Sequence, residues 1–429
     1  MEPRRRVVVI GGGFAGLACA QELAGDDRFA VTLIDRRNHH LFQPLLYQVA
    51  TAALAAPDIA RTLRGVLSRG RNVGVVLDEI IEIDLEGREV RSRERTYAYD
   101  YLVVAAGAQT SYFGNDEWGA CATGLKSLED AQAIRARVLS ALERAEICED
   151  EEERRRLMTI VIVGGGPTGV ELAGAFSDLV RRAMKSDFRR IDPAKLRIVL
   201  VEASERVLEG FAPGLSEYAA DHLGHLGVEV RTGRKMVTME PGRMQLSDGE
   251  VIAAETIIWA AGVRSSPLTG QLQCERDRGG RVKVKHDLSL PGHPEVFAAG
   301  DLVFIEGPDG KPAPGLAPAA QQMGLHIARV VKEDLRRGRD PSEGRRAESC
   351  SRFYYLDKGM MAIIGKNAAV MQAGKLRLRG FPAWVAWLFI HILFLIGFRN
   401  KLAVLLQWAW AYVADKPGAR VITGRPDRG

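Results

Sequence analysis

The sequence predicts an α/β protein with two Rossmann-like dinucleotide-binding domains and a C-terminal amphipathic helical region that associates with a membrane. The glycine pattern G-x-G-x-x-G occurs at residues 11–16 and again at residues 164–169. Each copy follows four apolar residues and precedes a stretch that can form a helix, which makes a nucleotide-binding turn far more probable than an isolated pattern would. In each half, an acidic residue ends a second apolar run. Near the C-terminus, residues 381–398 carry no charge if His391 is neutral.

The three glycines of each motif have separate tasks. The first permits a tight turn out of the strand, the second lets a pyrophosphate approach the backbone, and the third lets helix and strand pack closely. The helix start then directs N–H groups and partial positive charge at the phosphates. The residues expected to bind dinucleotides here are Gly11, Gly13, Phe14, Ala15 and Gly16 in the first motif and Gly164, Gly166, Pro167, Thr168 and Gly169 in the second. The alternative is two buried strands followed by purely structural turns.

Two carboxylates complete the predicted nucleotide sites. Asp35 ends the apolar run 31–34 and Glu202 ends the run 198–201, where an acidic residue can bind ribose hydroxyls. The longer spacing in the second unit is explained if the polar residues 181–194 are an insertion. Glu202 favours NADH over NADPH because a carboxylate repels a 2′-phosphate. NADPH stays an alternative because Arg206 lies close by in the sequence.

Further elements follow in order along the chain. Residues 127–156 are read as one helix, opened by a capping box at Ser127. A helix is also expected from about Ala319 to Leu335. Three apolar runs are read as buried strands that end in small turns: residues 99–105 before Ala106 and Gly107, 257–260 before Ala261 and Gly262, and 296–299 before Gly300 and Asp301.

Size and composition exclude several classes of protein. A chain of 429 residues suits two or three domains, and a net charge of +5 without a basic, aromatic-rich run predicts no nucleic-acid partner. The five cysteines are scattered and the eight histidines form no ligand pattern. We therefore expect free thiols, a reducing compartment and no metal.

The C-terminal region is apolar and rich in tryptophan. The uncharged run 381–398 is long enough to be considered as a membrane span, but Arg399 and Lys401 follow it, and the next apolar run, 402–414, is too short to cross. Tryptophan and tyrosine favour the membrane–water boundary. We favour a monotopic helix pair lying in the lipid surface. A transmembrane helix and a dimerisation surface are the alternatives.

Four stretches carry a family resemblance: residues 38–50 (NHHLFQPLLYQVA), 164–171, Gly300-Asp301 with 317–324 (APAAQQMG), and 397–401 (GFRNK). With these the chain resembles the type II NADH:quinone oxidoreductases, single-subunit NADH dehydrogenases that do not pump protons. The resemblance covers nearly the whole chain. It implies FAD on the first unit, NADH on the second, a membrane quinone as acceptor, and a homodimer. It also implies a peripheral, monotopic location on the cytoplasmic face of the inner membrane.

The resemblance also implies roles for particular residues. Glu171 and Gln322 are the expected catalytic residues, Glu171 beside the flavin and nicotinamide and Gln322 at the quinone site. Glu171 could equally be a solvated carboxylate at a helix start. Some family members have glutamine where this chain has Pro318. The quinone contact that the family assigns to this position is therefore not expected in this chain. The remaining expected cofactor contacts are Pro44, Leu45, Ala106, Gly107, Ala261, Gly262, Gly300, Asp301, Ala319 and Gln321.

The predicted domain order follows from these assignments. Its segments are 1–115 (FAD-binding domain, first part), 116–158 (connecting helical segment), 159–275 (NADH-binding domain), 276–345 (FAD-binding domain, second part) and 346–429 (membrane-associating region). Disulfide reductases are excluded because residues 38–60 contain no cysteine. An NADH-binding flavoprotein that acts as a redox sensor, and a flavin reductase with another acceptor, remain as alternatives.

Overall fold

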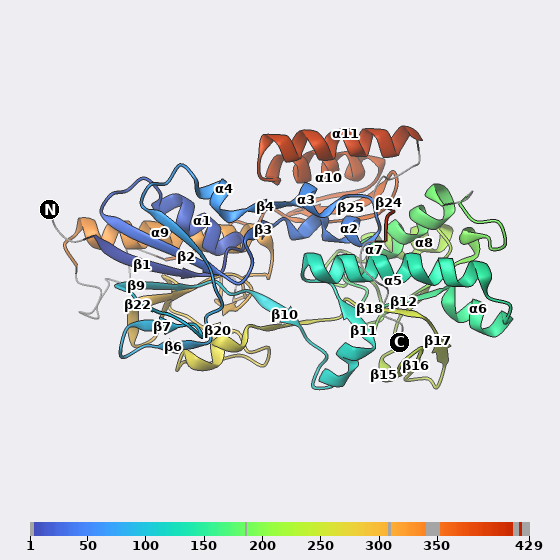
Figure 1. Cartoon of the computed structure of the whole chain (residues 1–429), viewed down its shortest axis with the longest axis horizontal. Helices are drawn as coiled ribbons and strands as arrows, with labels where there is room; N and C mark the ends of the chain where they lie inside the picture. Colours follow the sequence, from blue (N-terminus) through green and yellow to red (C-terminus); the bar gives the residue numbers. More distant parts are fainter. Residues whose placement is uncertain (1–3, 185–186, 308–309, 340–351, 415–419, 423–429) are drawn as a thin grey trace. The chain divides into compact units, whose positions relative to one another are not determined.

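The computed structural model describes residues 4–184, 187–307, 310–339, 352–414 and 420–422 (Figure 1). The chain forms two compact units. Unit 1 comprises Met1–Leu41, Ala60–Gln109 and Val263–Lys358, and unit 2 comprises Phe42–Ile59, Thr110–Gly262 and Gly359–Gly429. These limits differ from those of the five predicted segments, which remain predictions. The predicted boundary at 345/346 lies outside the described residues.

Unit 1 is built on a six-stranded sheet in the order β21-β22-β9-β1-β2-β5. Its strands are β1 (Arg5–Ile10), β2 (Phe29–Asp35), β5 (Val73–Leu77), β9 (Tyr101–Val104), β21 (Ser289–Leu290) and β22 (His293–Ala298). All neighbouring pairs are parallel except β21 with β22. Two helices, α1 (Phe14–Leu23) and α9 (Ala317–Arg336), cross closely, since a Cβ at Gly324 would lie 2.0 Å from the Ala15 carbonyl oxygen.

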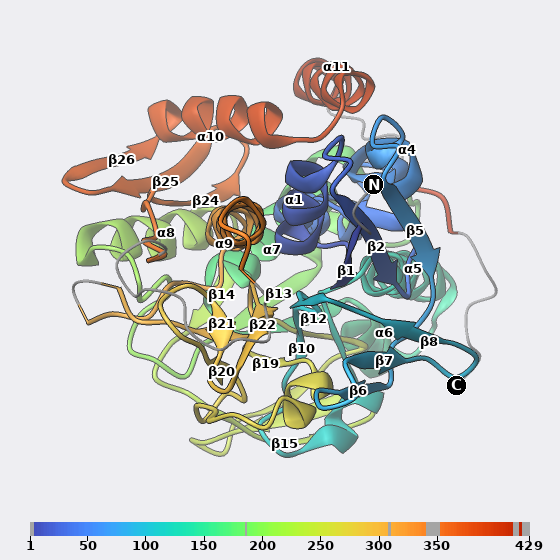
Figure 2. The same ribbon diagram turned by 90° about the vertical axis from the view of Figure 1, so that its left-hand side faces the viewer.

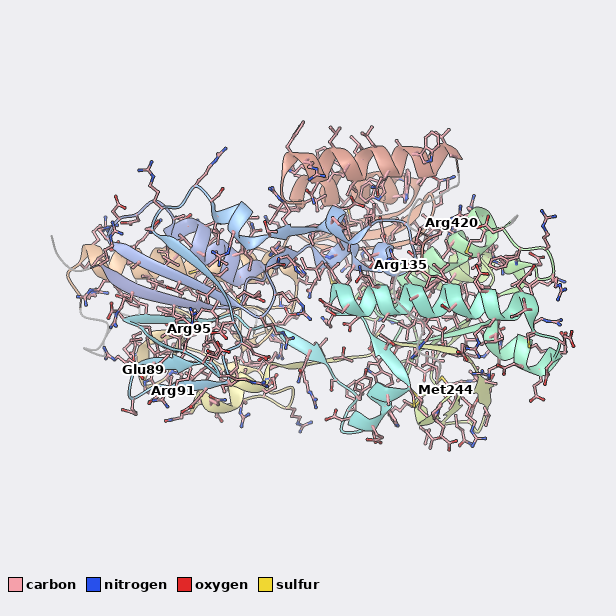
Figure 3. The ribbon with its side chains drawn as sticks, viewed as in Figure 1. Glu89, Arg91, Arg95, Arg135, Met244 and Arg420 are labelled. Carbon is pink, nitrogen blue, oxygen red and sulfur yellow. The ribbon has the colours of Figure 1, made fainter. Side chains whose placement is uncertain are left out.

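Small elements complete unit 1. Figure 3 labels Glu89 and Arg91 on one of its sheets, in which Arg91 pairs with Glu82 over 2.7 Å. The remaining bounds are β3 (His39–Leu41), β4 (Ala60–Thr62), α4 (Leu63–Leu67), β6 (Glu82–Asp84), β7 (Glu89–Arg91), β8 (Thr96–Ala98), β20 (Val282–Lys283), β23 (Val303–Phe304) and the 3₁₀ turn η5 (Pro267–Gln271). Strands β10 (Ala108–Thr110) and β19 (Val263–Ser265) lie at the limits of the units.

Unit 2 repeats the plan with a five-stranded parallel sheet in the order β11-β18-β12-β13-β14. Its strands are β11 (Ala122–Gly124), β12 (Thr159–Val163), β13 (Arg197–Val201), β14 (Val228–Arg231) and β18 (Thr256–Trp259), with helices α7 (Pro167–Asp178) and α8 (Pro213–His225). An antiparallel sheet of β15 (Met236–Glu240), β16 (Arg243–Leu246) and β17 (Val251–Ala253) shares its core: Met244, labelled in Figure 3, belongs to the same buried cluster as Val161 and Trp259. The short elements are η1 (Gln43–Leu45), α2 (Leu46–Ala50), α3 (Ala56–Ile59), η2 (Asp116–Ala120) and η4 (Pro193–Lys195). A π-helical turn at Leu179–Ala183 follows α7 and overlaps the start of the predicted insertion.

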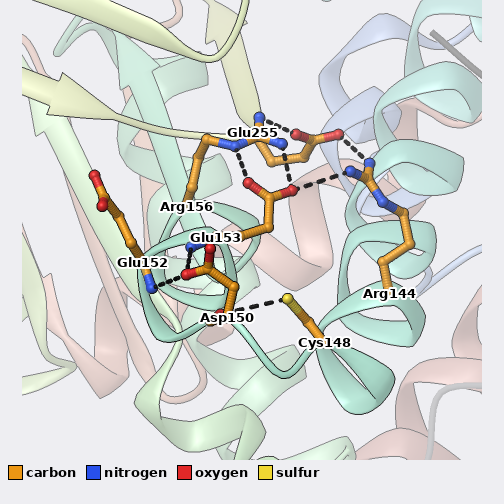
Figure 4. Close-up of polar contacts among 7 residues, drawn as sticks. All are labelled: Arg144, Cys148, Asp150, Glu152, Glu153, Arg156 and Glu255. Carbon is orange, nitrogen blue, oxygen red and sulfur yellow. Dashed lines mark hydrogen bonds and ion pairs between the residues drawn. The ribbon is translucent and has the colours of Figure 1, made fainter.

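The helix predicted over residues 127–156 is two helices, α5 (Leu128–Ile147) and α6 (Glu151–Leu157), so the single-helix prediction is wrong. The capping box is confirmed, because the Asp130 N–H donates to Ser127 Oγ and the Ser127 N–H donates to the Asp130 carboxylate. The break occurs because Asp150 caps a new helix, accepting the Glu152 N–H over 2.8 Å. In Figure 4, Glu255 bridges Arg144 and Arg156, which joins the two helices through ion pairs.

The C-terminal part of unit 2 contains a sheet that the sequence analysis did not identify. Strands β24 (Met360–Gly365), β25 (Ala368–Ala373) and β26 (Leu376–Gly380) form an antiparallel sheet, and β24 packs on α7. A Cβ at Gly174 of α7 would lie 2.5 Å from the Ile364 carbonyl oxygen. That close approach ties the C-terminal part to the second nucleotide unit.

Two apolar helices follow this sheet. Helices α10 (Phe381–Phe394) and α11 (Phe398–Ala414) are drawn next to one another in Figures 1 and 2, and α10 packs on β25 and β26. The uncharged run 381–398 is interrupted before Gly397, whose φ of 91° suits glycine. Helix α10 has 14 residues. At about 1.5 Å per residue this is about 21 Å, less than the roughly 30 Å of a bilayer core. Among the described residues, no helix is both long and apolar enough to cross a membrane.

Candidate functional site

The first glycine motif forms the turn between β1 and α1 in unit 1. Gly11 has a φ of 103°, and a Cβ there would lie 2.3 Å from the Ala105 carbonyl oxygen. A Cβ at Gly16 would lie 1.9 Å from the Gly11 carbonyl oxygen. By contrast, a Cβ at Gly13 would meet nothing within 4 Å. The backbone is therefore packed tightly at the first and third glycines and is open at the second, where a phosphate would approach.

The second motif repeats this geometry between β12 and α7 in unit 2. Gly164 has a φ of 112°, and a Cβ at Gly169 would lie 1.8 Å from the Gly164 carbonyl oxygen. A Cβ at Gly166 again meets nothing within 4 Å. The second glycines also match in conformation, with ψ of −165° at Gly13 and −177° at Gly166. Two separate segments therefore form the same local cradle.

Each predicted ribose carboxylate is hydrogen bonded to the middle of its own motif. Asp35, the last residue of β2, accepts the Gly12 N–H over 2.6 Å and the Arg37 N–H over 2.7 Å. Glu202 accepts the Gly165 N–H over 2.5 Å and the Ser204 N–H over 2.7 Å. Each carboxylate oxygen has further lone pairs, so both groups are held in place and can still accept from a ribose hydroxyl.

Small turns lie at the carboxyl ends of the neighbouring strands. In unit 1, Ala106 and Gly107 follow β9, and Gly300 and Asp301 lie just after β22. Gly107 has a φ of 66° and Gly300 a φ of 85°. In unit 2, Ala261 and Gly262 follow β18. Since β9 and β18 each pair with the strand before a glycine motif, these turns lie at the same sheet edge as the motif of their own unit.

Glu171 is the fifth residue of α7, just after its first turn, and contacts the C-terminal sheet. Its carboxylate accepts the Ile363 N–H of β24. The carboxyl is closely surrounded by protein although part of the side chain stays accessible to water, and burial raises its pKa to about 8. The Ile363 N–H opposes that rise only in part. The solvated carboxylate considered as an alternative does not describe this environment, because a freely solvated glutamate titrates near 4.3.

Gln322 lies on α9 in unit 1 with both ends of its amide engaged. Its Nε2 donates to the Leu356 carbonyl oxygen over 3.0 Å, and its Oε1 accepts the Leu356 N–H over 2.9 Å. The amide keeps one free hydrogen and one free lone pair for another partner. Of the other residues predicted on this helix, Ala319 is buried and Gln321 is exposed.

Three comparisons with known proteins agree with this architecture. Residues 5–324 match the family described as pyridine nucleotide-disulphide oxidoreductase. Two proteins of Mycobacterium tuberculosis, the type II NADH:quinone oxidoreductases Ndh and NdhA, are 42% and 41% identical to the chain, covering 98% of it and 91% and 90% of themselves. The chain belongs to the type II NADH:quinone oxidoreductases. A solved structure of NDH2 from Plasmodium falciparum in complex with NADH has a TM-score of 0.88 and covers 98% of the chain and 100% of its own. At 18% identity, that likeness is evidence for the fold alone.

In this type II oxidoreductase, the predicted site residues divide between the two units. Unit 1 holds the first motif, Asp35, Ala106, Gly107, Gly300, Asp301, Ala319, Gln321 and Gln322, and unit 2 holds the second motif, Glu171, Glu202, Ala261, Gly262, Pro44 and Leu45. Pro44 and Leu45 belong to η1, and Leu45 is fully buried. Their predicted contact with the flavin remains a prediction, as do the other ligand contacts.

Sequence reasoning missed three polar residues of unit 2. Tyr47 and Gln48 of α2 and Trp408 of α11 form one hydrogen-bonded chain. Tyr47 and Gln48 lie inside the motif that carried the family resemblance, but nothing local marks them, because Gln48 and Trp408 are 360 positions apart. Among the described residues, no group of three or more acidic, histidine or cysteine side chains could hold a metal ion.

Proposed function

We propose that this protein oxidises NADH and reduces a quinone, with FAD on unit 1 and NADH on unit 2, and that it pumps no protons. One observation carries the proposal: the two nucleotide cradles share one geometry in a chain that belongs to the type II NADH:quinone oxidoreductases. A pair of such cradles suits electron transfer between two dinucleotides. When bound, FAD accepts a hydride from NADH and delivers two electrons to a quinone, which takes up two protons.

The residues of unit 1 fit FAD. Space next to Gly13 would admit a pyrophosphate at the start of α1, whose free N–H groups would stabilise its charge. Asp35, already oriented by the Gly12 N–H, would bind ribose hydroxyls. The turns at Gly107 and Gly300 would admit the rest of the cofactor close to the backbone, with Asp301 beside it.

Unit 2 fits NADH better than NADPH. Glu202 lies where a ribose would bind, and its charge would repel a 2′-phosphate. Arg206 donates to the Glu209 carbonyl oxygen over 3.2 Å, which gives it a partner other than a phosphate. A higher kcat/KM for NADPH than for NADH would overturn this assignment.

Glu171 would act as a proton-holding group. With its pKa raised to about 8 by burial, it carries its proton near neutral pH. A neutral carboxyl can donate a hydrogen bond to a substrate or supply a proton to a product, and it introduces no negative charge beside an electron-rich cofactor. This is the role we assign to it.

We further propose that α10 and α11 attach the enzyme to a lipid surface. Four of the five exposed large apolar side chains of α10 follow one stripe, Phe381, Val385, Phe389 and Leu393, and the fifth is Phe394. Those of α11 are Phe398, Leu402, Leu405, Leu406, Trp410, Tyr412 and Val413. Lys375, Arg377 and Arg379 precede α10, Arg399 and Lys401 lie in the first turn of α11, and these cations would meet anionic headgroups. The exposed apolar side chains of both helices suit a monotopic position in a lipid surface. From the family resemblance, we propose that this surface is the cytoplasmic face of the inner membrane.

A homodimer is expected from the family resemblance, and the same apolar helices offer one surface for it. Sedimentation of the detergent-free protein would reveal the oligomeric state. If Phe389→Glu produced monomers without changing vesicle binding, the α10 stripe would be a dimer interface and not a lipid contact.

The activity is tested by anaerobic mixing of the flavin-loaded protein with NADH and then with menadione. Rapid bleaching of the flavin, followed by quinone-dependent recovery over many turnovers, is expected. A stable charge-transfer band that menadione does not discharge would identify a redox sensor. Bleaching that only another acceptor reverses would identify a different reductase. Protein that stays colourless after reconstitution with FAD would refute the proposal.

A further inference from the structure

Two buried side chains and one half-buried side chain form a hydrogen-bonded series within unit 2. Trp408 Nε1 of α11 donates to Gln48 Oε1 of α2 over 2.8 Å. Gln48 Nε2 in turn donates to the hydroxyl oxygen of Tyr47 over 2.8 Å. Tyr47 and Gln48 are buried, and Trp408 is half-buried.

The chemistry of these groups determines the direction of every hydrogen bond in the chain. An indole N–H can only donate, so the end of the Gln48 amide that meets Trp408 must be the carbonyl oxygen. The other end is therefore the NH₂ group, and the Tyr47 oxygen must accept from it. The phenolic hydrogen of Tyr47 is left without an acceptor among the residues that the structure describes. A buried donor without a partner is costly, which points to a ligand as the missing acceptor.

The surroundings of Tyr47 indicate which ligand this is. Its ring meets Trp387 of α10 edge-on, with centroids 6.4 Å apart, and Trp387 lies 5.6 Å from Trp408. Tyr47 is thus in contact with the inner side of the helix pair whose outer side is apolar. An acceptor dissolved in lipid, with a carbonyl oxygen on an apolar ring, matches both the aromatic surroundings and the free hydroxyl hydrogen.

A proton source lies close to Tyr47. Helix α2 packs on α7, which carries Glu171. Burial raises the pKa of Tyr47 well above its ordinary value, and the nearby charge of Glu171 raises it further. Tyr47 therefore keeps its proton over the whole working pH range, next to a carboxyl that also holds a proton near neutral pH.

We infer that Tyr47 is a further catalytic residue that donates a hydrogen bond, and then a proton, to a carbonyl oxygen of the quinone. Gln48 and Trp408 are positioning residues that aim the hydroxyl. The inference rests on the proposed quinone reduction. The quinone receives two electrons from the reduced enzyme. The Tyr47 O–H bond breaks as a quinol O–H bond forms, the phenolate takes the proton of Glu171, and water reprotonates Glu171. The second quinol proton comes from solvent.

The test uses the flavin-loaded enzyme reduced with NADH and mixed rapidly with menadione or with ferricyanide. In Tyr47→Phe the ring stays and the hydroxyl is lost, so reoxidation by menadione should slow about a hundredfold or more, the usual range for a general acid. Reoxidation by ferricyanide, which takes up electrons without protons, should be unchanged. The solvent deuterium isotope effect on the menadione step should also fall. Tyr97→Phe is the matched control, because Tyr97 also has a bonded hydroxyl, donating to Asp78 over 2.7 Å.

Gln48→Met is a second test that keeps the length of the side chain. Methionine has no N–H and is only a weak acceptor, so the Tyr47 hydroxyl would lose the hydrogen bond that aims it at the quinone. The menadione step should slow, while reoxidation by ferricyanide should be unchanged. Unchanged menadione kinetics in Tyr47→Phe would overturn the inference. The inference would also be overturned if the reoxidation rates with menadione and with ferricyanide fell equally and the melting temperature were lower. That result would show that the three hydrogen-bonded side chains only stabilise the fold. If NADH reduced the wild-type enzyme but menadione never reoxidised it, the proposed function itself would fail, and this inference with it.

Discussion

The exposed apolar stripe of α10 leads to a quantitative prediction about membrane attachment. The exposed fractions of Phe381, Val385, Phe389 and Leu393 are 54%, 46%, 68% and 56%. Complete burial of such a side chain contributes about 1.5–3 kcal/mol, so transferring the exposed part of Phe389 into lipid contributes about 1–2 kcal/mol. At about 1.4 kcal/mol per tenfold, Phe389→Ser should lower the partition coefficient roughly 5–30-fold. By the same scaling, the stripe as a whole contributes about 3–7 kcal/mol, so replacing all four side chains should reduce binding by at least about a hundredfold.

The assay is flotation with vesicles of phosphatidylcholine and phosphatidylglycerol, with the bound fraction measured against lipid concentration. The matched control is Ile147→Ser, because Ile147 is 72% exposed at the end of α5 and lies outside both apolar helices. It should bind like the wild type. The reasoning is refuted if Phe389→Ser binds like the wild type, or if Ile147→Ser loses as much affinity as Phe389→Ser.

The further predictions concern side chains and glycines of the two nucleotide units. If protonated Glu171 supplies a proton to quinone, that step should slow as pH rises through about 8, and Glu171→Gln should be slower and lack this dependence while keeping its FAD. Because the folded pKa is raised, ionisation of this carboxyl destabilises the fold as pH increases from its unfolded value through about 8, so the Tm advantage of Glu171→Gln should be greatest above pH 8. Gly16→Ala, with its Cβ 1.9 Å from a carbonyl oxygen, should lose the yellow colour of FAD, whereas Gly169→Ala should stay yellow and show a much higher KM for NADH. Glu202→Gln should raise the kcat/KM ratio of NADPH to NADH, measured by steady-state kinetics. Glu255→Gln should lower the free energy of unfolding by about 1–3 kcal/mol in urea titrations, less at high salt, because two guanidinium groups lose their shared acceptor.

The nucleotide cradles could be predicted because their requirements are local. A strand, a turn that needs glycine and a helix start occupy adjacent residues, so the pattern at residues 11–16 already implies the positive φ of Gly11 and the close packing at Gly16. The capping box at Ser127 was readable for the same reason. The length of the helix was not, because the cap at Asp150 competes with an otherwise helical composition.

Contacts between distant segments could not be read in this way. Residues 375–379 (KLRLR) alternate but are few, and residues 360–374 show no such period, so the sheet of β24, β25 and β26 was not predicted. It is stabilised largely by packing on α7, through the close approach at Gly174. The two hydrogen bonds between the Gln322 amide and the Leu356 backbone could not be predicted either, because they depend on where another segment of the chain lies.

By itself, the sequence determined the family, the two nucleotide cradles with their carboxylates, and the apolar character of the C-terminal helices. Only the tertiary structure decided that the Glu171 carboxyl is buried against β24, which changes the pH at which it holds a proton. Only the tertiary structure joined Trp408 to Tyr47 through Gln48. The physical reason is the distance along the sequence between the groups that interact. The backbone conformation of a turn or a helix start follows from neighbouring residues. Burial, pKa and the direction of a buried hydrogen bond depend on which distant groups the folded chain packs together.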